Sequence, residues 1–161
     1  MFYKDVLFKK YDQDTEYIKA INYLLDKYTI KPDNQILASI IGYSWFYYIE
    51  GDLNSCPKEY DWSFFREIFE KYFIKYIEKH DFDCLVDFIS YFAIYISEIH
   101  FEEFAQYLPV LKNRLIESKF ELFKILFKNN ENNNNSIILQ SNFDKEYSLE
   151  KYFYNYLANY I

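Results

Sequence analysis

The sequence predicts an all-α fold, and three observations support that prediction. The chain has only two glycines and three prolines among 161 residues, too few for the many tight turns that sheets and barrels need. Apolar residues recur three and four positions apart along most of the chain, which is the period of an amphipathic helix. The length suits one domain with a sizeable core. We therefore expect residues 1–161 to form a single helical domain of about six to seven helices.

The first predicted helix begins near residue 15 and ends before Pro32. Asp14 or Thr15 is a suitable N-cap, because a short polar side chain can accept a hydrogen bond from a free backbone N–H of the first turn. The apolar side chains at helical spacing are Tyr17, Ile18, Ile21, Leu24, Leu25 and Tyr28.

Residues 36–49 form an uncharged run, ILASIIGYSWFYYI. As a helix it rises only about 21 Å, short of the roughly 30 Å hydrocarbon core of a bilayer, so a membrane span is not expected. A helix that is apolar nearly all round is usually the buried centre of a domain. We expect Asp33 to cap this helix, Gly51 to end it in a left-handed conformation, and Ala38 and Gly42 to permit close approach of another helix.

Two further amphipathic helices are predicted in the middle of the chain. The first runs from about residue 62 to 79, with Asp61 as its cap. Its inner face is Phe65, Ile68, Phe69, Tyr72, Phe73 and Tyr76, and its outer face carries Glu67, Glu70, Lys71 and Lys75. The second runs from about residue 83 to 99, and its predicted inner face is Leu85, Phe88, Ile89, Phe92, Tyr95, Ile96 and Ile99.

The last third of the chain is less regular. A short helix near 101–108 is followed by one from Pro109 to about Ser118, and residues 120–127 either continue it or begin a new helix. The Asn-rich segment 129–136 is expected to be an exposed loop, and 137–139 is too short to assign. Ser148 is the expected cap of a final helix, whose inner residues are Leu149, Tyr152, Phe153, Tyr156 and Leu157.

Short connections make sequential helices neighbours. No repeat with the signature of a known solenoid family is found, so an irregular bundle and a HEAT-like stack of antiparallel helical hairpins both stay open.

Signatures of catalysis or cofactor binding are missing from the sequence. Two glycines cannot build the usual phosphate-binding loop. His80 and Cys84 are four residues apart, but a structural zinc site needs four ligands. Two histidines also offer little choice of catalytic base. We expect a protein that is not an enzyme and that holds no metal or cofactor. A small metal-dependent enzyme would require His80, Cys84 and carboxylates to converge.

Net charge indicates which classes of partner the chain can bind, and cysteine content indicates its cellular compartment. The net charge of −7 opposes direct binding to nucleic acid, which depends on Lys and Arg neutralising phosphates. The start of the chain lacks the apolar stretch of a secretory signal, and Cys56 and Cys84 are too few for a disulfide framework. We therefore expect a cytoplasmic protein that neither binds nucleic acid nor enters a membrane. The sequence does not indicate the oligomeric state.

Acidic residues are concentrated where Lys and Arg are missing. Residues 80–111 contain no Lys or Arg, and 32–61 contain five acids against Lys58 alone. On the wheel of the 83–99 helix, the outward arc contains Asp87, Tyr91, Ile94 and Glu98. One interpretation is a surface that recognises a basic partner protein, with Tyr91 as an apolar anchor and acids that steer association. The other is that a further helix covers Tyr91 and Ile94.

The residues predicted to contact the partner come from these two acidic segments. They are Glu50, Asp52, Asp81, Asp83, Asp87, Tyr91, Ile94, Glu98, Glu102 and Glu103.

The chain's size, its lysine-free stretch 80–111 and Tyr-rich helices such as YSWFYYIEGD support a comparison with a known class. In these features it resembles the small, acidic, aromatic-rich helical immunity proteins that bacteria encode beside contact-dependent and other polymorphic toxins. The resemblance is one of type, over the whole chain, and carries over no individual residue. It implies stoichiometric occlusion of a cognate toxin domain, often a basic nuclease. The alternative is a phage or host helical adaptor or anti-defence protein that binds a basic partner.

Overall fold

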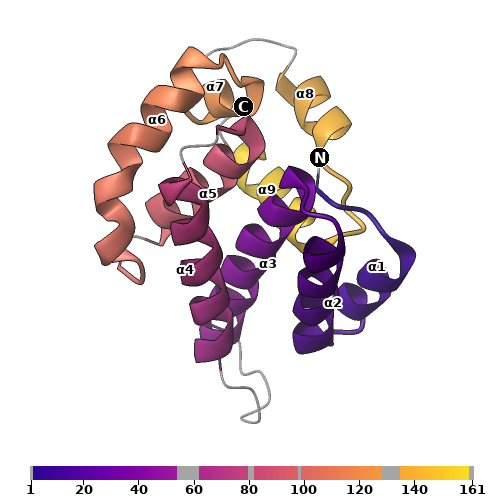
Figure 1. Cartoon of the computed structure of the whole chain (residues 1–161). Coiled ribbons are helices and arrows are strands. Elements are labelled where there is room, and N and C mark those ends of the chain that lie inside the picture. The colour runs from indigo at the N-terminus through magenta and orange to yellow at the C-terminus, as the bar shows by residue number, and fades with distance from the viewer. Residues whose placement is uncertain (1, 54–61, 80–81, 98, 128–134, 160–161) are drawn as a thin grey trace.

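The structure is a computed structural model that describes residues 2–53, 62–79, 82–97, 99–127 and 135–159 (Figure 1). Over these residues the chain forms one all-α domain without strands, as predicted, but with nine α-helices rather than six or seven. They are α1 (Val6–Gln13), α2 (Tyr17–Ile30), α3 (Asn34–Leu53), α4 (Ser63–Glu78), α5 (Cys84–Ile96), α6 (Leu108–Glu117), α7 (Glu121–Phe127), α8 (Asn135–Asn142) and α9 (Ser148–Ala158), with the 3-10 helix η1 (Glu102–Tyr107) between α5 and α6.

Helix α3 is the centre of the domain and contacts α2, α4, α5 and α9 (Figure 1). The contact with α9, far along the chain, favours an irregular bundle, because in a linear stack each unit contacts only its neighbours. Residues 36–47 are all buried, which confirms that the uncharged run is core. The Asp33 carboxylate accepts hydrogen bonds from the backbone N–H groups of Gln35 and Ile36, at 2.8 and 3.3 Å, and so caps α3 as predicted.

Of the two predictions made for the glycines of α3, one is confirmed and one is wrong. At Gly42 an added Cβ would lie 2.8 Å from Leu149 Cδ2 and 3.1 Å from Ile89 Cγ2, so the predicted close approach is confirmed. The prediction for Gly51 is wrong, because α3 continues to Leu53. Gly51 therefore lies inside the helix and does not end it.

The N-terminal region contains a helix that periodicity did not reveal. Asp5 caps α1 by accepting hydrogen bonds from the N–H groups of Leu7 and Phe8. The predicted cap of the following helix is wrong: Asp14 is the C-cap of α1, and Thr15 has a φ of 58°. Both residues are used in the turn between α1 and α2, so neither caps α2.

Helix α5 is a second buried helix, packed against α3 on one side and α6 on another. Residues 86–94 are all buried, including several that periodicity placed outward. Two residues predicted to point inward are exposed instead, Tyr95 by 46% and Ile99 by 94%. The prediction is confirmed for Phe88, Ile89 and Phe92, which are fully buried, and wrong for Tyr95 and Ile99 and for the residues placed outward. Apolar residues occur on all sides of α5, so the wheel could not distinguish one buried face from another.

Helix α4 agrees with its prediction, since Phe65, Phe69, Phe73 and Tyr76 are buried. Its expected cap Asp61 lies outside the described residues. Pro109 occupies the first turn of α6 as expected, and residues 120–127 begin a new helix, α7. Of the Asn-rich segment, 129–134 lies outside the described residues. Residues 135–142, including 137–139, form α8, so the predicted loop is wrong for residues 135 and 136.

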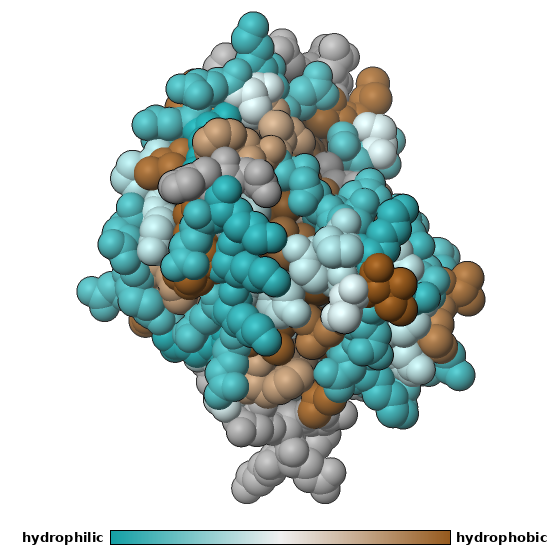
Figure 2. Space-filling model, viewed as in Figure 1, coloured by the Kyte–Doolittle hydropathy of each residue, from teal (hydrophilic) through white to brown (hydrophobic). Residues whose placement is uncertain are grey.

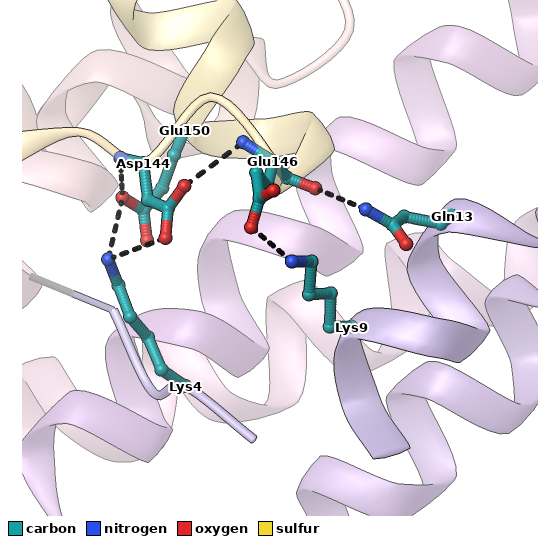
Figure 3. A network of polar contacts seen from close by, with 6 residues as sticks. All are labelled: Lys4, Lys9, Gln13, Asp144, Glu146 and Glu150. Atoms are coloured by element: carbon teal, nitrogen blue, oxygen red, sulfur yellow. Dashed lines mark hydrogen bonds and ion pairs between the residues drawn. The ribbon is translucent and has the colours of Figure 1, made fainter. Parts of the chain in front are cut away.

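The N-terminal segment is held against the loop that precedes α9 (Figure 3). Lys4 Nζ lies 3.3 Å from the Asp144 carboxylate and 3.7 Å from that of Glu150, while Lys9 forms an ion pair with Glu146. These contacts bring together the two ends of the sequence. Within the described part of the chain, no helix is long and apolar enough to cross a membrane.

Candidate partner-binding surface

The structure separates the ten predicted partner-binding residues into three groups. Asp81 and Glu98 lie outside the described residues, as do the side chains of Glu50 and Asp52, whose backbone is in α3. Four residues of the described part of α5 and its cap are buried or occupied within the fold: Asp83, Asp87, Tyr91 and Ile94. Glu102 and Glu103 are exposed on η1.

Asp87 is 2% exposed, so its predicted place on an outward stripe is wrong. Its Oδ1 accepts a 2.8 Å hydrogen bond from the Tyr76 hydroxyl of α4 and lies 3.4 Å from Arg114 Nη1 of α6. Burial raises the pKa of the Asp87 carboxyl, and these two donors oppose the rise. Arg114 also lies over the ring of Phe82, 4.2 Å from its centroid. Asp87 therefore connects three helices inside the domain.

Tyr91 and Ile94 are also inside the fold, at 3% and 0% exposure, so their predicted outward position is wrong. The Tyr91 ring meets Phe123 of α7 edge to face at 5.4 Å and stacks on Tyr95 at 5.6 Å. Burial raises the pKa of the Tyr91 phenol to about 12. A helix covers this face of α5, which is the second of the two interpretations that the sequence left open.

Asp83 has a local structural role as the N-cap of α5. One of its carboxylate oxygens accepts hydrogen bonds from the N–H groups of Leu85 and Val86, at 3.0 and 3.1 Å. The other accepts from the side-chain amide of Asn34 at the start of α3. A capping carboxylate with three donors has little capacity left for a partner.

The exposed acids of η1 stand beside a groove between η1 and α4. The groove has a volume of about 410 Å³ and is lined by Glu67, Glu70, Lys71, Ile74 and Phe104. Arg66 links the two elements, because its Nε donates to Glu70 at 2.7 Å and its terminal nitrogen pairs with Glu103. Hydrogen bonding to Glu70 raises the pKa of the Arg66 guanidinium, so this side chain stays charged.

We call Glu67, Glu70, Ile74, Glu102, Glu103 and Phe104 the η1–α4 surface. Of its four carboxylates, those of Glu70 and Glu103 are paired with Arg66, whereas Glu67 and Glu102 form no ion pair with a described residue. Among the described residues, Lys71 is the cation that lines the groove. Ile99, almost fully exposed, lies in the turn that leads into η1. On the face shown in Figure 2, hydrophobic residues appear as separate spots among hydrophilic ones rather than as one broad apolar patch. An acidic surface with small apolar elements is suited to a cationic partner.

Sequence reasoning identified Glu102 and Glu103 but not the α4 side of this surface. Glu67 and Glu70 were correctly predicted to face away from the core, yet nothing in the sequence indicated that Phe104, more than thirty positions later, lies against them. Their exposure was the only available signal.

A second group of polar residues is buried and joins distant segments. Asp12 accepts hydrogen bonds from the Tyr47 hydroxyl at 2.7 Å and from Ser148 N–H and Oγ, at 2.8 and 2.5 Å. Ser148 was predicted to cap α9, but its hydroxyl is used here instead. Burial raises the pKa of Asp12, opposed by these donors. This cluster holds α1, α3 and α9 together.

Glu150 is fully buried on α9. Its Oε2 accepts a 2.5 Å hydrogen bond from the Asp144 N–H (Figure 3). Within the described part of the chain, Glu150 Oε1 has no hydrogen-bond partner, and neither has the buried Tyr43 hydroxyl. Burial raises the pKa of the Glu150 carboxyl more than Lys4 and the Asp144 N–H lower it.

Among the described residues, no three His, Cys, Asp or Glu side chains converge as metal ligands would. Cys84 is half-buried at the start of α5, and His80 lies outside the described residues. Comparisons of the chain with protein-family models, curated proteins and solved structures found no significant match.

Proposed function

We propose that the chain is an immunity-type protein that binds a basic toxin domain through the η1–α4 surface and neutralises it by stoichiometric occlusion. The observation that carries the proposal is the position of Glu102 and Glu103, which are exposed beside a groove that two further glutamates and an apolar floor complete. The chain's acidic balance and aromatic-rich helices support the same class.

The physical argument rests on charge complementarity. A nuclease or other phosphate-binding domain presents Lys and Arg where its substrate binds. Carboxylates on the η1–α4 surface attract such a surface over a distance and speed its encounter with this chain. Once bound, the acids pair with the cations that would otherwise hold phosphates, and the half-buried Ile74 side chain supplies apolar contact. No catalytic step by this chain is needed.

The test begins with the partner. Tagged protein is used to isolate its partner from the native host, and the product of the neighbouring upstream gene is expressed with and without this chain to ask whether growth is restored. Binding of the purified toxin domain is then measured at several salt concentrations. The informative variant is the double reversal Glu102→Lys/Glu103→Lys, which we expect to slow association roughly tenfold or more and to reduce its salt dependence.

A matched control carries the same change in charge elsewhere. Asp26 on α2 and Glu117 on α6 are both exposed, so Asp26→Lys/Glu117→Lys alters the net charge equally without touching the η1–α4 surface. If the two double variants slow association to the same extent, net charge and not this surface governs binding. If co-expression never protects cells from the neighbouring gene product, the immunity function is wrong.

A further inference from the structure

A second feature of α4 lies away from the η1–α4 surface. A pocket of about 160 Å³ is formed where the end of α2 and the start of α3 meet α4. Tyr28 comes from α2, Leu37 from α3, and Tyr72 and Tyr76 from α4. The groove of the η1–α4 surface shares none of these residues, so the two sites are separate.

The pocket is cationic although the chain is acidic. Lys75 and Lys79 line it one helical turn apart, both are exposed, and neither forms an ion pair with a described residue. Two like charges at this spacing repel each other. Among the described residues, Asp33 is the one acid that lines the pocket, and its Oδ1 accepts the backbone N–H groups of Gln35 and Ile36. Its negative charge offsets one of the two ammonium groups, so the lining keeps a net positive charge.

Neutral hydrogen-bond donors accompany these cations. The rings of Tyr28 and Tyr72 meet edge to face at 5.8 Å, and neither hydroxyl bonds to another described residue. Burial raises the pKa of both phenols, so each keeps its proton at neutral pH and remains a donor. The Tyr76 hydroxyl, in contrast, already donates to Asp87.

The size of the pocket limits what it can hold. One water needs about 10–15 Å³ of such volume, so the pocket has room for a small polyatomic anion. The oxygens of a tetrahedral oxyanion accept hydrogen bonds from ammonium and phenol donors at once.

We propose that the pocket of Tyr28, Tyr72, Lys75 and Lys79 binds a phosphate group, either as the free anion or at the end of a small phosphomonoester. Lys75 and Lys79 supply the charge, and the two tyrosines supply neutral donors. This site does not depend on the proposed immunity function, because the experiment below needs no partner protein.

The test is a titration of the purified chain followed by amide chemical shifts in NMR. Inorganic phosphate is added to one sample and sodium chloride of equal ionic strength to another, and we expect saturable shifts of Asn34 and Lys79 with phosphate alone. Lys75→Gln/Lys79→Gln should weaken binding at least about tenfold. The control Lys10→Gln/Lys124→Gln removes two exposed cations elsewhere and should stay within about twofold of the parent.

A second titration, with glycerol 3-phosphate, identifies the source of the phosphate. Single lysine variants are a replacement if the double variant does not fold. Tighter binding of glycerol 3-phosphate than of inorganic phosphate indicates a phosphomonoester, and equal or weaker binding indicates the free anion. The single variants Lys75→Gln and Lys79→Gln, each checked by circular dichroism, serve if the double variant does not fold. Equal shifts with chloride, or undiminished affinity in the lysine variants, would overturn the proposal.

Discussion

Arg114 on α6 places a guanidinium nitrogen 3.4 Å from the carboxylate of Asp87 on α5, and both side chains are largely withdrawn from water. The hydroxyl of Tyr76 on α4 donates to the same carboxylate oxygen. A buried carboxylate without such partners would be costly to keep charged. The pair therefore ties α6 to the face of α5 that it covers.

Arg114→Met should destabilise the chain because it leaves the Asp87 carboxylate without its cation. We expect a loss of about 2 kcal/mol, below the roughly 3–5 kcal/mol of a fully buried pair because Arg114 keeps some exposure. The measurement is the urea midpoint at an unchanged m-value. Arg66→Met is the control, since its exposed ion pairs with Glu70 and Glu103 should cost less than about 1 kcal/mol. Equal losses in the two variants would contradict the role given to Asp87.

Asp12→Ala should cost more than the loss of one hydrogen bond, because Asp12 accepts from Tyr47 and from two groups of Ser148. The fully buried Tyr47 hydroxyl would be left without a partner, and we expect a loss of about 2–4 kcal/mol. Tyr47→Phe removes that hydroxyl and should cost about 1 kcal/mol. In a double-mutant cycle by urea unfolding, the two losses should be less than additive. Strict additivity would show that the two side chains do not interact.

Stability should depend on pH through Glu150. Burial makes the pKa of this carboxyl higher in the folded chain than its ordinary value near 4.5, so the folded state binds the proton more tightly. Stability is therefore lost as the pH rises from that value through the folded pKa. Asp12 and Asp87 act in the same direction, whereas the lowered pKa values of Asp5 and Asp144 remove stability only in more acidic solution.

Glu150→Gln is the variant that isolates this effect, because glutamine keeps an acceptor for the Asp144 N–H. We expect the parent to lose more stability than this variant between about pH 5 and pH 8, as measured by urea unfolding at each pH. Glu146→Gln changes an exposed acid of the same loop and should leave the parent's slope in place. The same slope in Glu150→Gln would mean that Glu150 titrates alike in the folded and unfolded chains.

Gly42→Ala should destabilise the core despite the better helix propensity of alanine. The new Cβ would lie 2.8 Å from Leu149 Cδ2, in a region where Leu149 is fully buried. Overpacking costs about 1–3 kcal/mol, whereas replacing a helical glycine returns at most about 1 kcal/mol. We expect a net loss of about 1 kcal/mol in thermal or urea unfolding. Adding Gly42→Ala to Leu149→Ala should instead stabilise that variant, because the methyl then fills space that the leucine vacates.

The sequence predicted the fold class and most helices because periodicity and caps are local signals. Asp33 and Phe65 to Tyr76 behave as expected on this basis. Helix α1 was missed because eight residues contain few apolar repeats, although Asp5 followed by VLF was an available capping signal. Gly51 was misread because glycine is also tolerated inside a helix.

The candidate site was harder to predict because it depends on which helices cover which faces. Helix α5 is apolar all round, so its sequence could not show that α6 and α7 pack over Asp87 and Tyr91. The groove likewise depends on how η1 packs against α4, where the Phe104 ring meets those of Phe69 and Phe73 edge to face. Glu102 and Glu103 were selected because they lie in the acidic segment 80–111, and the structure places both at the surface.

Ile94 and Ile99 should respond in opposite ways to the same substitution. Ile94 is fully buried on α5, so Ile94→Asn places an unpaired amide in the core and should cost about 3 kcal/mol or more. Ile99 is 94% exposed, so Ile99→Asn should change stability by less than about 0.5 kcal/mol. Urea unfolding of both variants measures this contrast, and a large loss in Ile99→Asn would mean that the turn before η1 is packed differently.

If Ile99 supplies apolar contact beside the η1–α4 surface, Ile99→Asn should also weaken partner binding, while Ile137→Asn, at an exposed position of α8, should not.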